Sequence, residues 1–296
     1  MKKLMSTLAL TLTAALVLSA CFGGDKLTVG TQTYSETKTL AYMYKELIED
    51  QTDIKVDVKT DMATDTMVLE AMIKDDLEIG TTYTGTALTS FFEMDDPSDQ
   101  EGTIEQTQEA FKDEYNIHVF DPLGFANTYA IAVTEDFAEE HDVEKVSDLE
   151  DIANELDFSS DSSWFERKGE DGYEAFVDLY GFDFKDVSPM QPNLVYEALK
   201  NGESDVSLAY STDARIDMFD LETLEDDKNF FPPYDAQSYV NQETLDEHPE
   251  LEEIFESLEG KIDLDVIRDL NRRVDDDGEE PADVAVDFLE EEGMLE

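Results

Sequence analysis

The chain has 296 residues and carries 20 Lys and Arg against 75 Asp and Glu, a net charge of −55. A surface this acidic repels polyanions, which excludes nucleic acid as a general partner. Hydrophobic residues still make up 41% of the chain and aromatic residues 10%, so the composition predicts a folded protein and not a disordered acidic chain.

The first twenty residues have the pattern of an export signal. Lys2 and Lys3 give a positive start, and an apolar stretch follows over residues 4–17. The signal ends in Leu18-Ser19-Ala20-Cys21, the residue order of a bacterial lipobox. We therefore expect Cys21 to carry a lipid that anchors the protein to the outer face of the cell membrane. The alternative is an ordinary secretory signal with a cysteine near the cut.

Removal of this signal leaves 18 basic and 75 acidic residues, a net charge of −57. Repulsion within such a surface destabilises the fold in dilute buffer and is tolerated where salt shortens the Debye length to a few ångströms. The charge therefore indicates a saline habitat. Cys21 is the only cysteine, so core packing must hold the mature chain together without intramolecular disulfides.

Short apolar runs alternate with amphipathic helical patterns from Lys26 onward, which predicts an α/β protein with largely parallel sheets. The predicted strands of the first part are 27–30, 54–58 and 77–82, and the predicted helices are 39–48, 65–73 and 104–115. The turn Tyr83-Thr84-Gly85-Thr86 follows the third strand. Open α/β sheets bind ligands at such carboxyl ends of strands.

A second lobe is expected to begin at the apolar run 129–133. Its predicted elements are helices at 146–154, 173–180 and 194–200 and a strand at 206–210. Phe230-Phe231-Pro232-Pro233-Tyr234 then breaks the pattern as a crossing point, and the remainder, including 245–258 and 284–289, is mostly helical. The predicted organisation is a signal peptide at 1–20, a tether at 21–25, lobe I at 26–125 and 232–296, and lobe II at 126–231.

Catalytic and metal-binding patterns are missing from the sequence. His118, His141 and His248 lie far apart, and none has a second His or a Cys at metal-ligand spacing. His248 precedes Pro249, which favours a loop or a helix boundary there. A nucleophile elbow, a phosphate loop and a dinucleotide fingerprint are absent as well. We therefore expect a binding protein without metal or cofactor; a lipid-anchored hydrolase would need a nucleophile and a base at recognisable spacing.

Four tyrosines stand at turns or strand ends: Tyr83, Tyr129, Tyr210 and Tyr234. A methylated ammonium group has no N–H to donate, so a protein holds it with several converging aromatic faces. The placement of the four tyrosines suits such a cleft, although tyrosine is also often half-buried for packing alone.

Basic side chains are few, so each is a candidate partner for a ligand carboxylate. Arg167 and Lys168 follow Trp164, and Lys38 lies between the first strand and its helix. The alternative is that each pairs with neighbouring acids on the surface, which is the interpretation we prefer for Lys168.

Five stretches resemble the substrate-binding lipoproteins of osmoprotectant ABC transporters, of the glycine betaine/carnitine/choline-binding type. The stretches are Tyr83-Thr84-Gly85-Thr86, Gly124-Phe125-Ala126-Asn127-Thr128-Tyr129, Ser163-Trp164-Phe165-Glu166-Arg167-Lys168-Gly169, Leu208-Ala209-Tyr210-Ser211-Thr212-Asp213 and Phe230-Phe231-Pro232-Pro233-Tyr234-Asp235. They occur in the same order as in that family, from Lys26 to the end of the chain.

The resemblance implies a type II periplasmic-binding-protein fold with the ligand in the cleft between two lobes. It also implies capture of glycine betaine, or a related quaternary-ammonium solute, for a cognate ABC permease and ATPase, without catalysis. The residues that it assigns to the ligand are a cage of Tyr83, Tyr129, Tyr210 and Tyr234 with Trp164 close by, and Arg167, Lys38, Thr86 and Asn127 at the carboxylate or hydroxyl end. Thr86 resembles the broader-specificity members, because some choline-restricted relatives carry an acidic residue there. The alternative ligand is another small cationic solute or an amino acid.

Overall fold

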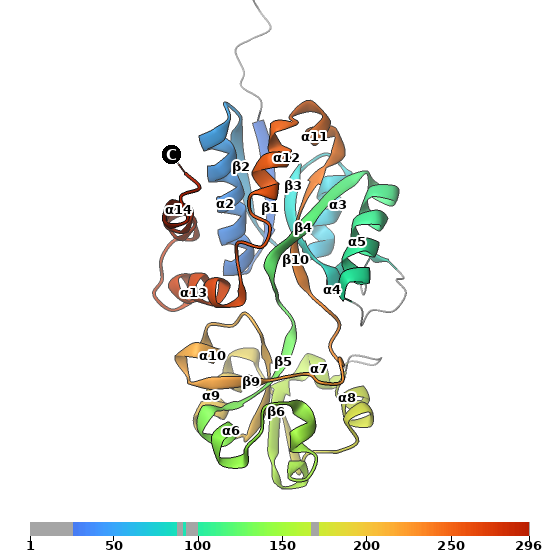
Figure 1. The fold of residues 1–296 in the computed structure, drawn as a ribbon, viewed down its shortest axis with the longest axis vertical. Helices are drawn as coiled ribbons and strands as arrows, with labels where there is room; N and C mark the ends of the chain where they lie inside the picture. The colour runs from blue at the N-terminus through green and yellow to red at the C-terminus, as the bar shows by residue number, and fades with distance from the viewer. Residues whose placement is uncertain (1–25, 88–90, 93–99, 167–171, 296) are drawn as a thin grey trace, which may run out of the picture.

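The computed structural model describes residues 26–87, 91–92, 100–166 and 172–295, which form two α/β lobes, one above the other in Figure 1. Lobe I is built on the sheet β2-β1-β3-β10-β4, and lobe II on the sheet β7-β6-β8-β5-β9. The chain enters lobe II between β4 and β5 and returns between β9 and β10. The α/β class predicted from the sequence is therefore confirmed. No helix in the described ranges has both the length and the apolar character needed to cross a membrane.

Lobe I has helices on both faces of its sheet. Its strands are β1 (Lys26–Gln32), β2 (Lys55–Met62), β3 (Ile79–Tyr83), β4 (Ile117–Ala126) and β10 (Asp235–Asn241). Its helices are α2 (Ser35–Gln51), α3 (Asp65–Ile73), α4 (Thr84–Thr86), α5 (Gln100–Tyr115), α11 (Gln242–Glu247), α12 (Glu250–Glu256), α13 (Leu264–Asp275) and α14 (Pro281–Glu291). Helices α2, α12 and α14 share one apolar cluster with the sheet, and α3 and α5 share another.

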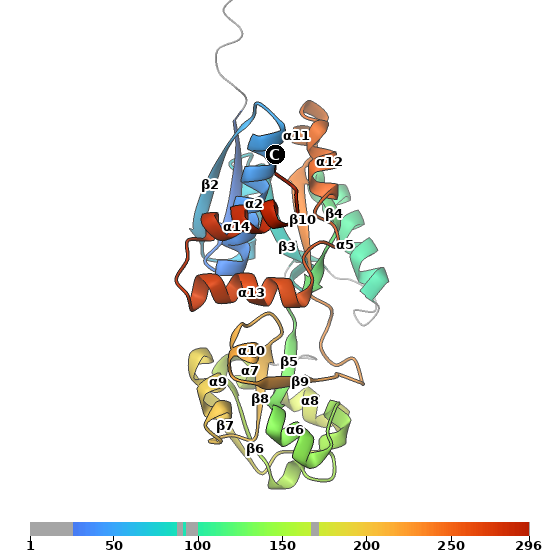
Figure 2. The same cartoon turned by 60° about the vertical axis from the view of Figure 1, so that its left-hand side comes forward.

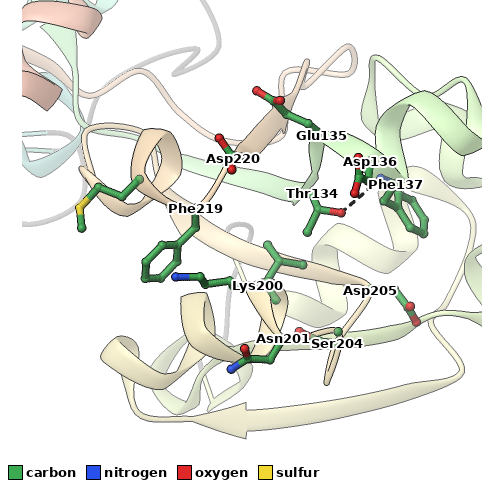
Figure 3. A pocket seen from close by; sticks show the side chains of 13 residues that line it. Thr134, Glu135, Asp136, Phe137, Lys200, Asn201, Ser204, Asp205, Phe219 and Asp220 are labelled. Atoms are coloured by element: carbon green, nitrogen blue, oxygen red, sulfur yellow. Dashed lines mark hydrogen bonds between the residues drawn. The ribbon is translucent and has the colours of Figure 1, made fainter.

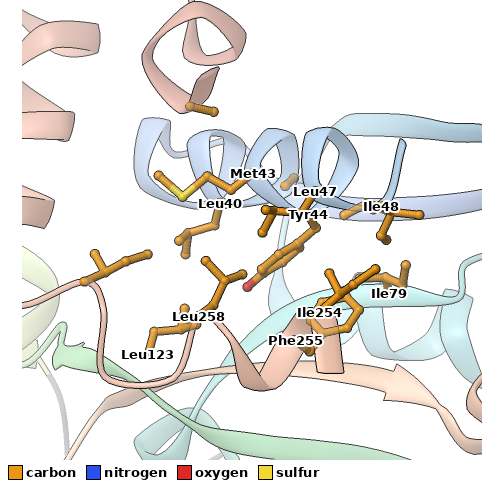
Figure 4. Packing of buried hydrophobic residues seen from close by; sticks show 14 of the residues in the cluster. Leu40, Met43, Tyr44, Leu47, Ile48, Ile79, Leu123, Ile254, Phe255 and Leu258 are labelled. Atoms are coloured by element: carbon orange, nitrogen blue, oxygen red, sulfur yellow. The ribbon is translucent and has the colours of Figure 1, made fainter. Parts of the chain in front are cut away.

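Helix α2 fixes the strands that lead to the cleft. Its residues Leu40, Met43 and Tyr44 are fully buried, and the Tyr44 ring lies 5.2 Å from that of Phe255 on α12 (Figure 4). The Tyr44 hydroxyl lies 2.9 Å from the Thr81 hydroxyl on β3 and accepts a hydrogen bond of 2.9 Å from Ser238 on β10. Burial raises the pKa of Tyr44 to about 12, so this hydroxyl stays protonated and ties the helix to both strands.

Lobe II is smaller and its core is rich in aromatic rings. Its strands are β5 (Tyr129–Thr134), β6 (Asp157–Asp161), β7 (Asp186–Met190), β8 (Val206–Tyr210) and β9 (Leu221–Leu224). Its helices are α6 (Glu135–His141), the 3₁₀ turns η2 (Val146–Leu149) and η3 (Ala153–Glu155), α7 (Ser162–Glu166), α8 (Tyr173–Tyr180), α9 (Pro192–Lys200) and α10 (Arg215–Met218). Phe158, Trp164 and Phe176 are fully buried at its centre.

Both sheets are mixed, which differs from the largely parallel sheets predicted from the sequence. Strand β1 pairs in parallel with β2 and β3, and β6 pairs in parallel with β7 and β8. Strand β10 runs antiparallel to β3 and β4, and β5 runs antiparallel to β8 and β9. The antiparallel strands β5 and β10 are the ones that follow the two crossings between lobes. They therefore enter their sheets from the cleft side, opposite to the strands of the βαβ units.

The local sequence explains where several elements begin and end. Thr64 and Asp263 cap α3 and α13, because their side chains accept the N–H groups of Met67 and Val266. The helix predicted at 146–154 is instead the pair of 3₁₀ turns η2 and η3, since the Asp148 carboxylate accepts the N–H groups of residues 144 and 145 and favours a tight turn there. The helical run 245–258 is split between α11 and α12 at Pro249, as the residue before a proline disfavours helix.

Candidate ligand-binding site

A pocket of about 570 Å³ lies between the two lobes. It is formed by the first turn of α2 and the loop before it, the carboxyl ends of β3 and β8, the loop after β8, the two crossing segments and helices α3, α4, α9, α10 and α13. The residues that line it are Thr33, Tyr34, Ser35, Glu36, Asp65, Tyr83, Thr86, Asn127, Tyr196, Tyr210, Thr212, Asp213, Arg215, Tyr234, Asn271 and Asp275. The walls therefore combine tyrosine rings with carboxylates and amides.

Three of the four cage tyrosines line this pocket. Tyr83 ends β3, Tyr210 ends β8, and Tyr234 lies in the segment that returns to lobe I. Tyr129 is not among the lining residues, but its ring centroid lies 5.0 Å from that of Tyr210, to which it is paired across the sheet. Burial, with a smaller contribution from Tyr129, raises the pKa of Tyr210, so its phenol is neutral at physiological pH.

The ring of Tyr234 lies against the backbone of α4. A Cβ atom on Gly85 would come within 2.4 Å of Tyr234 Cδ1, so a larger residue at position 85 would displace the ring. The segment 83–86, expected as a turn, forms the single helical turn α4 after Tyr83. Thr84 joins α4 to the chain on both sides of Tyr234. Its hydroxyl donates to Pro233 O at 2.9 Å and accepts from the N–H of Asp235 at 2.9 Å.

Glu36 is a buried carboxylate in the wall of the pocket. Its Oε1 accepts hydrogen bonds from the Tyr83 hydroxyl at 2.5 Å and from Asn127 Nδ2 at 3.0 Å, and its Oε2 accepts one from Asn271 Nδ2 at 3.3 Å. Burial, and then the adjacent Glu36 carboxylate, raise the pKa of Tyr83 well above its usual value. The Tyr83 hydroxyl is therefore a lasting donor to Glu36.

On the lobe II side, the guanidinium of Arg215 lies over a tyrosine ring. Its guanidinium carbon is 4.0 Å from the centroid of the Tyr196 ring. The Asp213 carboxylate accepts hydrogen bonds from Arg215 Nε, at 2.8 Å, and from Nη2. Among the described residues that line the pocket, Arg215 is the one basic side chain.

Of the residues predicted for the polar end of the ligand, some line the pocket and others do not. Thr86 and Asn127 line the pocket, and the backbone N–H of Asn127 donates to Tyr234 O at 3.0 Å. Lys38 lies in the first turn of α2 and is not among the lining residues. Arg167 and the proposed lipid site Cys21 lie outside the described residues.

Trp164 lies in the core of lobe II and not at the pocket surface, because its side chain is 0% exposed. Its ring centroid is 6.3 Å from that of Phe231, which in turn lies 5.8 Å from Tyr129. A chain of packed rings therefore links Trp164 to Tyr129 through Phe231.

Helix α13 of lobe I lies next to the loop after β8 of lobe II, as Figure 2 shows, and contacts it through two side chains. Arg268 Nε donates to Ser211 O at 2.7 Å, and Asn271 Nδ2 donates to Thr212 O at 3.0 Å. Both side chains are buried, so this contact is a part of the interlobe structure rather than a loose surface pairing.

A second pocket, of about 610 Å³, lies within lobe II between α6, α9 and α10 (Figure 3). Lys200 Nζ lies 3.7 Å from the centroid of the Phe219 ring in its wall. No tyrosine is among its described lining residues, and all of them belong to one lobe. The interlobe pocket is therefore the candidate ligand site.

Sequence reasoning did not single out Glu36, Tyr196 or Arg215. A single glutamate carries little information among 75 acidic residues, and Tyr196 belongs to the apolar face of helix α9. The signal available in the sequence was Arg215, two residues after Asp213 at the end of the Tyr210 motif, since this i, i+2 spacing allows the observed pairing.

Solved structures share this architecture. A crystal structure described as a glycine betaine/carnitine/choline ABC transporter protein is 40% identical, with a TM-score of 0.88 over 91% of this chain and 100% of that chain. Lactococcal OpuAC in its closed form with glycine betaine has the same fold at 13% identity, with a TM-score of 0.55 over 91% of this chain and 96% of that chain. The two lobes and the pocket between them thus define a binding protein of the type II periplasmic fold.

Sequence comparison places the chain within this class. The family model OpuAC, the substrate binding domain of ABC-type glycine betaine transport systems, matches residues 25–291. The carnitine transport binding protein OpuCC of Listeria monocytogenes is 39% identical over 295 residues, covering 97% of this chain and 96% of that protein. A glycine-betaine-binding protein of Pseudomonas aeruginosa is 30% identical over 308 residues, covering 100% and 97%.

The chain belongs to the family of substrate-binding domains of ABC-type glycine betaine transport systems. It is therefore an extracytoplasmic solute-binding protein of an ABC importer, with a small-molecule ligand and with a permease and an ATPase as partners. Members of this family bind solutes and are not enzymes, as the sequence predicted.

Proposed function

We propose that this protein captures glycine betaine and related quaternary-ammonium solutes, such as carnitine and choline, for osmoprotective import. The observation that carries the proposal is the interlobe pocket lined by Tyr83, Tyr210 and Tyr234 beside a buried carboxylate. The relatives named for carnitine and for glycine betaine support the same class of ligand.

The pocket suits a methylated cation for a physical reason. A trimethylammonium group donates no hydrogen bond, so it is held by dispersion and by the negative faces of aromatic rings, at roughly 0.5 to 2 kcal/mol for each ring. Tyr83, Tyr210 and Tyr234 supply such rings from both lobes, and the Tyr129 ring packs against that of Tyr210. We propose that the lobes, residues 26–125 with 232–296 and residues 126–231, close on the ligand.

The polar end of the ligand needs donors. Thr86 and Asn127 line the pocket and retain this role in the proposal, and the guanidinium of Arg215 is an additional donor on the lobe II wall. Arg167 and Lys38 remain predictions from the sequence. We assign Trp164 a packing role, since it contacts Phe231 and not the pocket.

A second candidate is a small cationic solute of another kind, such as a polyamine. Glu36, Asp65, Asp213 and Asp275 give the pocket an acidic lining that favours any cation. A thermal-shift panel separates the candidates. Glycine betaine should raise the unfolding midpoint, while putrescine and glutamate should not; a shift with putrescine alone would reject the quaternary-ammonium proposal.

We also propose that Cys21 carries a lipid that anchors the protein to the membrane. The support is the order Leu18-Ser19-Ala20-Cys21 after an apolar stretch, with no other thiol in the chain. The variant Cys21→Ala should lose lipid labelling in cells. Labelling equal to that of the parent would show that the anchor is elsewhere or absent.

A further inference from the structure

Glu36 is a buried carboxylate in the wall of the interlobe pocket, and the described residues give it no cationic partner. The residue is 3% exposed, and its neighbours within hydrogen-bonding distance are the Tyr83 hydroxyl and the amides of Asn127 and Asn271. All three are neutral groups. Within the described part of the chain, no Lys, Arg or His makes an ion pair with Glu36. Among the residues that the structure describes, no cation therefore balances the charge of this carboxylate.

A buried carboxylate of this kind is costly, because neutral donors replace only part of its hydration. The cost falls when a cation enters the same cavity. We propose that Glu36 is the fixed anion that pairs with the cationic end of the ligand and so makes affinity depend on the ligand's net charge. This inference rests on the proposed function, because it names the group that the quaternary ammonium meets besides the tyrosine rings.

The hydrogen bonds around Glu36 hold it ready for this role. The Tyr83 hydroxyl donates to Glu36 at 2.5 Å, so the carboxylate is held beside a ring that lines the pocket. Asn271 donates both to Glu36 at 3.3 Å and to Thr212 O of lobe II at 3.0 Å. The carboxylate is thus fixed by lobe I, by the crossing segment and by the interlobe contact before any ligand arrives, which is electrostatic preorganisation.

The chemistry of three ligands turns this role into a ranking. Choline carries one positive charge and no carboxylate, whereas glycine betaine and carnitine each carry a carboxylate that Glu36 repels. The carboxylate is farther from the ammonium in carnitine than in glycine betaine. For charges about 5 Å apart at an effective dielectric constant of about 20, removing the Glu36 charge should weaken the binding of choline by roughly 200- to 300-fold and that of glycine betaine roughly 10-fold or less. Carnitine should fall between them.

Calorimetric titration of the parent and of Glu36→Gln with the three ligands tests the ranking. Glutamine keeps the shape of the side chain and removes its charge. Glu78→Gln is the matched control: this carboxylate accepts the N–H of Thr28 at 2.6 Å directly before β3, at the end of that strand opposite Tyr83. The control should leave the dissociation constants of all three ligands unchanged, whereas Glu36→Gln should weaken choline most and glycine betaine least.

Equal losses for choline and glycine betaine in Glu36→Gln would overturn the proposal and reduce Glu36 to a group that positions Tyr83. No loss for any ligand would overturn it as well. If Glu36→Gln does not fold, Glu36→Asp keeps the charge but withdraws it by one methylene, and it should give the same order with smaller factors. A parent protein that binds none of the three ligands would instead refute the proposed function, and the role of Glu36 with it.

Discussion

The tyrosines of the interlobe pocket differ in what their hydroxyls do. The Tyr83 hydroxyl donates to Glu36, and the Tyr196 hydroxyl accepts the N–H of Tyr210 at 2.9 Å. Tyr210 and Tyr234 line the same pocket. We expect them to act mainly through their ring faces, which gives substitutions at these positions a clear signature.

Tyr210→Ala and Tyr234→Ala should each weaken the binding of glycine betaine by roughly 0.5 to 2 kcal/mol, because a cation–π contact is lost. Tyr210→Phe and Tyr234→Phe should cost less, since the ring face is retained. Calorimetric titration of the four variants measures the difference. If Phe and Ala cost the same at both positions, the hydroxyls and not the ring faces hold the ligand.

At the scale of elements, the short helix α4 determines where the ring of Tyr234 lies. A Cβ atom at Gly85 would meet Tyr234 Cδ1 at 2.4 Å, which is closer than carbon atoms can approach, so the ring must move. Gly85→Ala should therefore reduce the free energy of binding glycine betaine by more than it reduces the free energy of unfolding.

Gly80→Ala is the comparison for this prediction. There the added Cβ would lie 3.1 Å from Tyr239 Cε1, in the apolar cluster under α3 and α5 and away from the pocket. It should lower the unfolding midpoint and leave affinity unchanged. A Gly85→Ala protein with parental affinity would show that Tyr234 does not need its present position.

The sequence predicted the regular elements well where the pattern was local. Helices α3 and α8 begin and end at the predicted residues, and β8 does so as well. Strands β6, β7 and β10 were missed because their sequences lack a long apolar run: Asp157–Asp161 is polar at four of its five positions, Asp186–Met190 is mostly exposed, and Asp235–Asn241 buries polar side chains. Pairing partners far away in the chain stabilise these strands, and local patterns do not contain that information.

The candidate site was only partly accessible from the sequence. The motifs led to Tyr83, Tyr210, Tyr234, Thr86 and Asn127, all of which line the pocket. Glu36 could not be identified as a site residue from the sequence, because what distinguishes it from the other acidic residues is its burial beside Tyr83 and not its residue type. Trp164 was placed near the ligand by its motif, whereas its side chain packs in the core of lobe II. Burial and direction of a side chain are properties of the assembled fold.

At the scale of the whole molecule, surface charge should control stability. The basic residues are too few to balance the acids, and some already serve two of them, as Arg273 does with Glu279 and Asp287. The remaining carboxylates repel one another over a distance set by the Debye length. The unfolding midpoint should therefore rise steadily between about 0.05 and 2 M NaCl. A midpoint that does not change with salt would argue against adaptation to a saline habitat.

The central claim is that a quaternary ammonium group occupies the pocket between the lobes. A crystal structure of this protein grown with glycine betaine tests it most directly. We predict the trimethylammonium group among the rings of Tyr83, Tyr210 and Tyr234, on the side of the Glu36 carboxylate, with the ligand carboxylate toward Thr86 or Arg215. Glycine betaine bound elsewhere, or a fully ligand-free interlobe pocket at saturating glycine betaine, would contradict the claim.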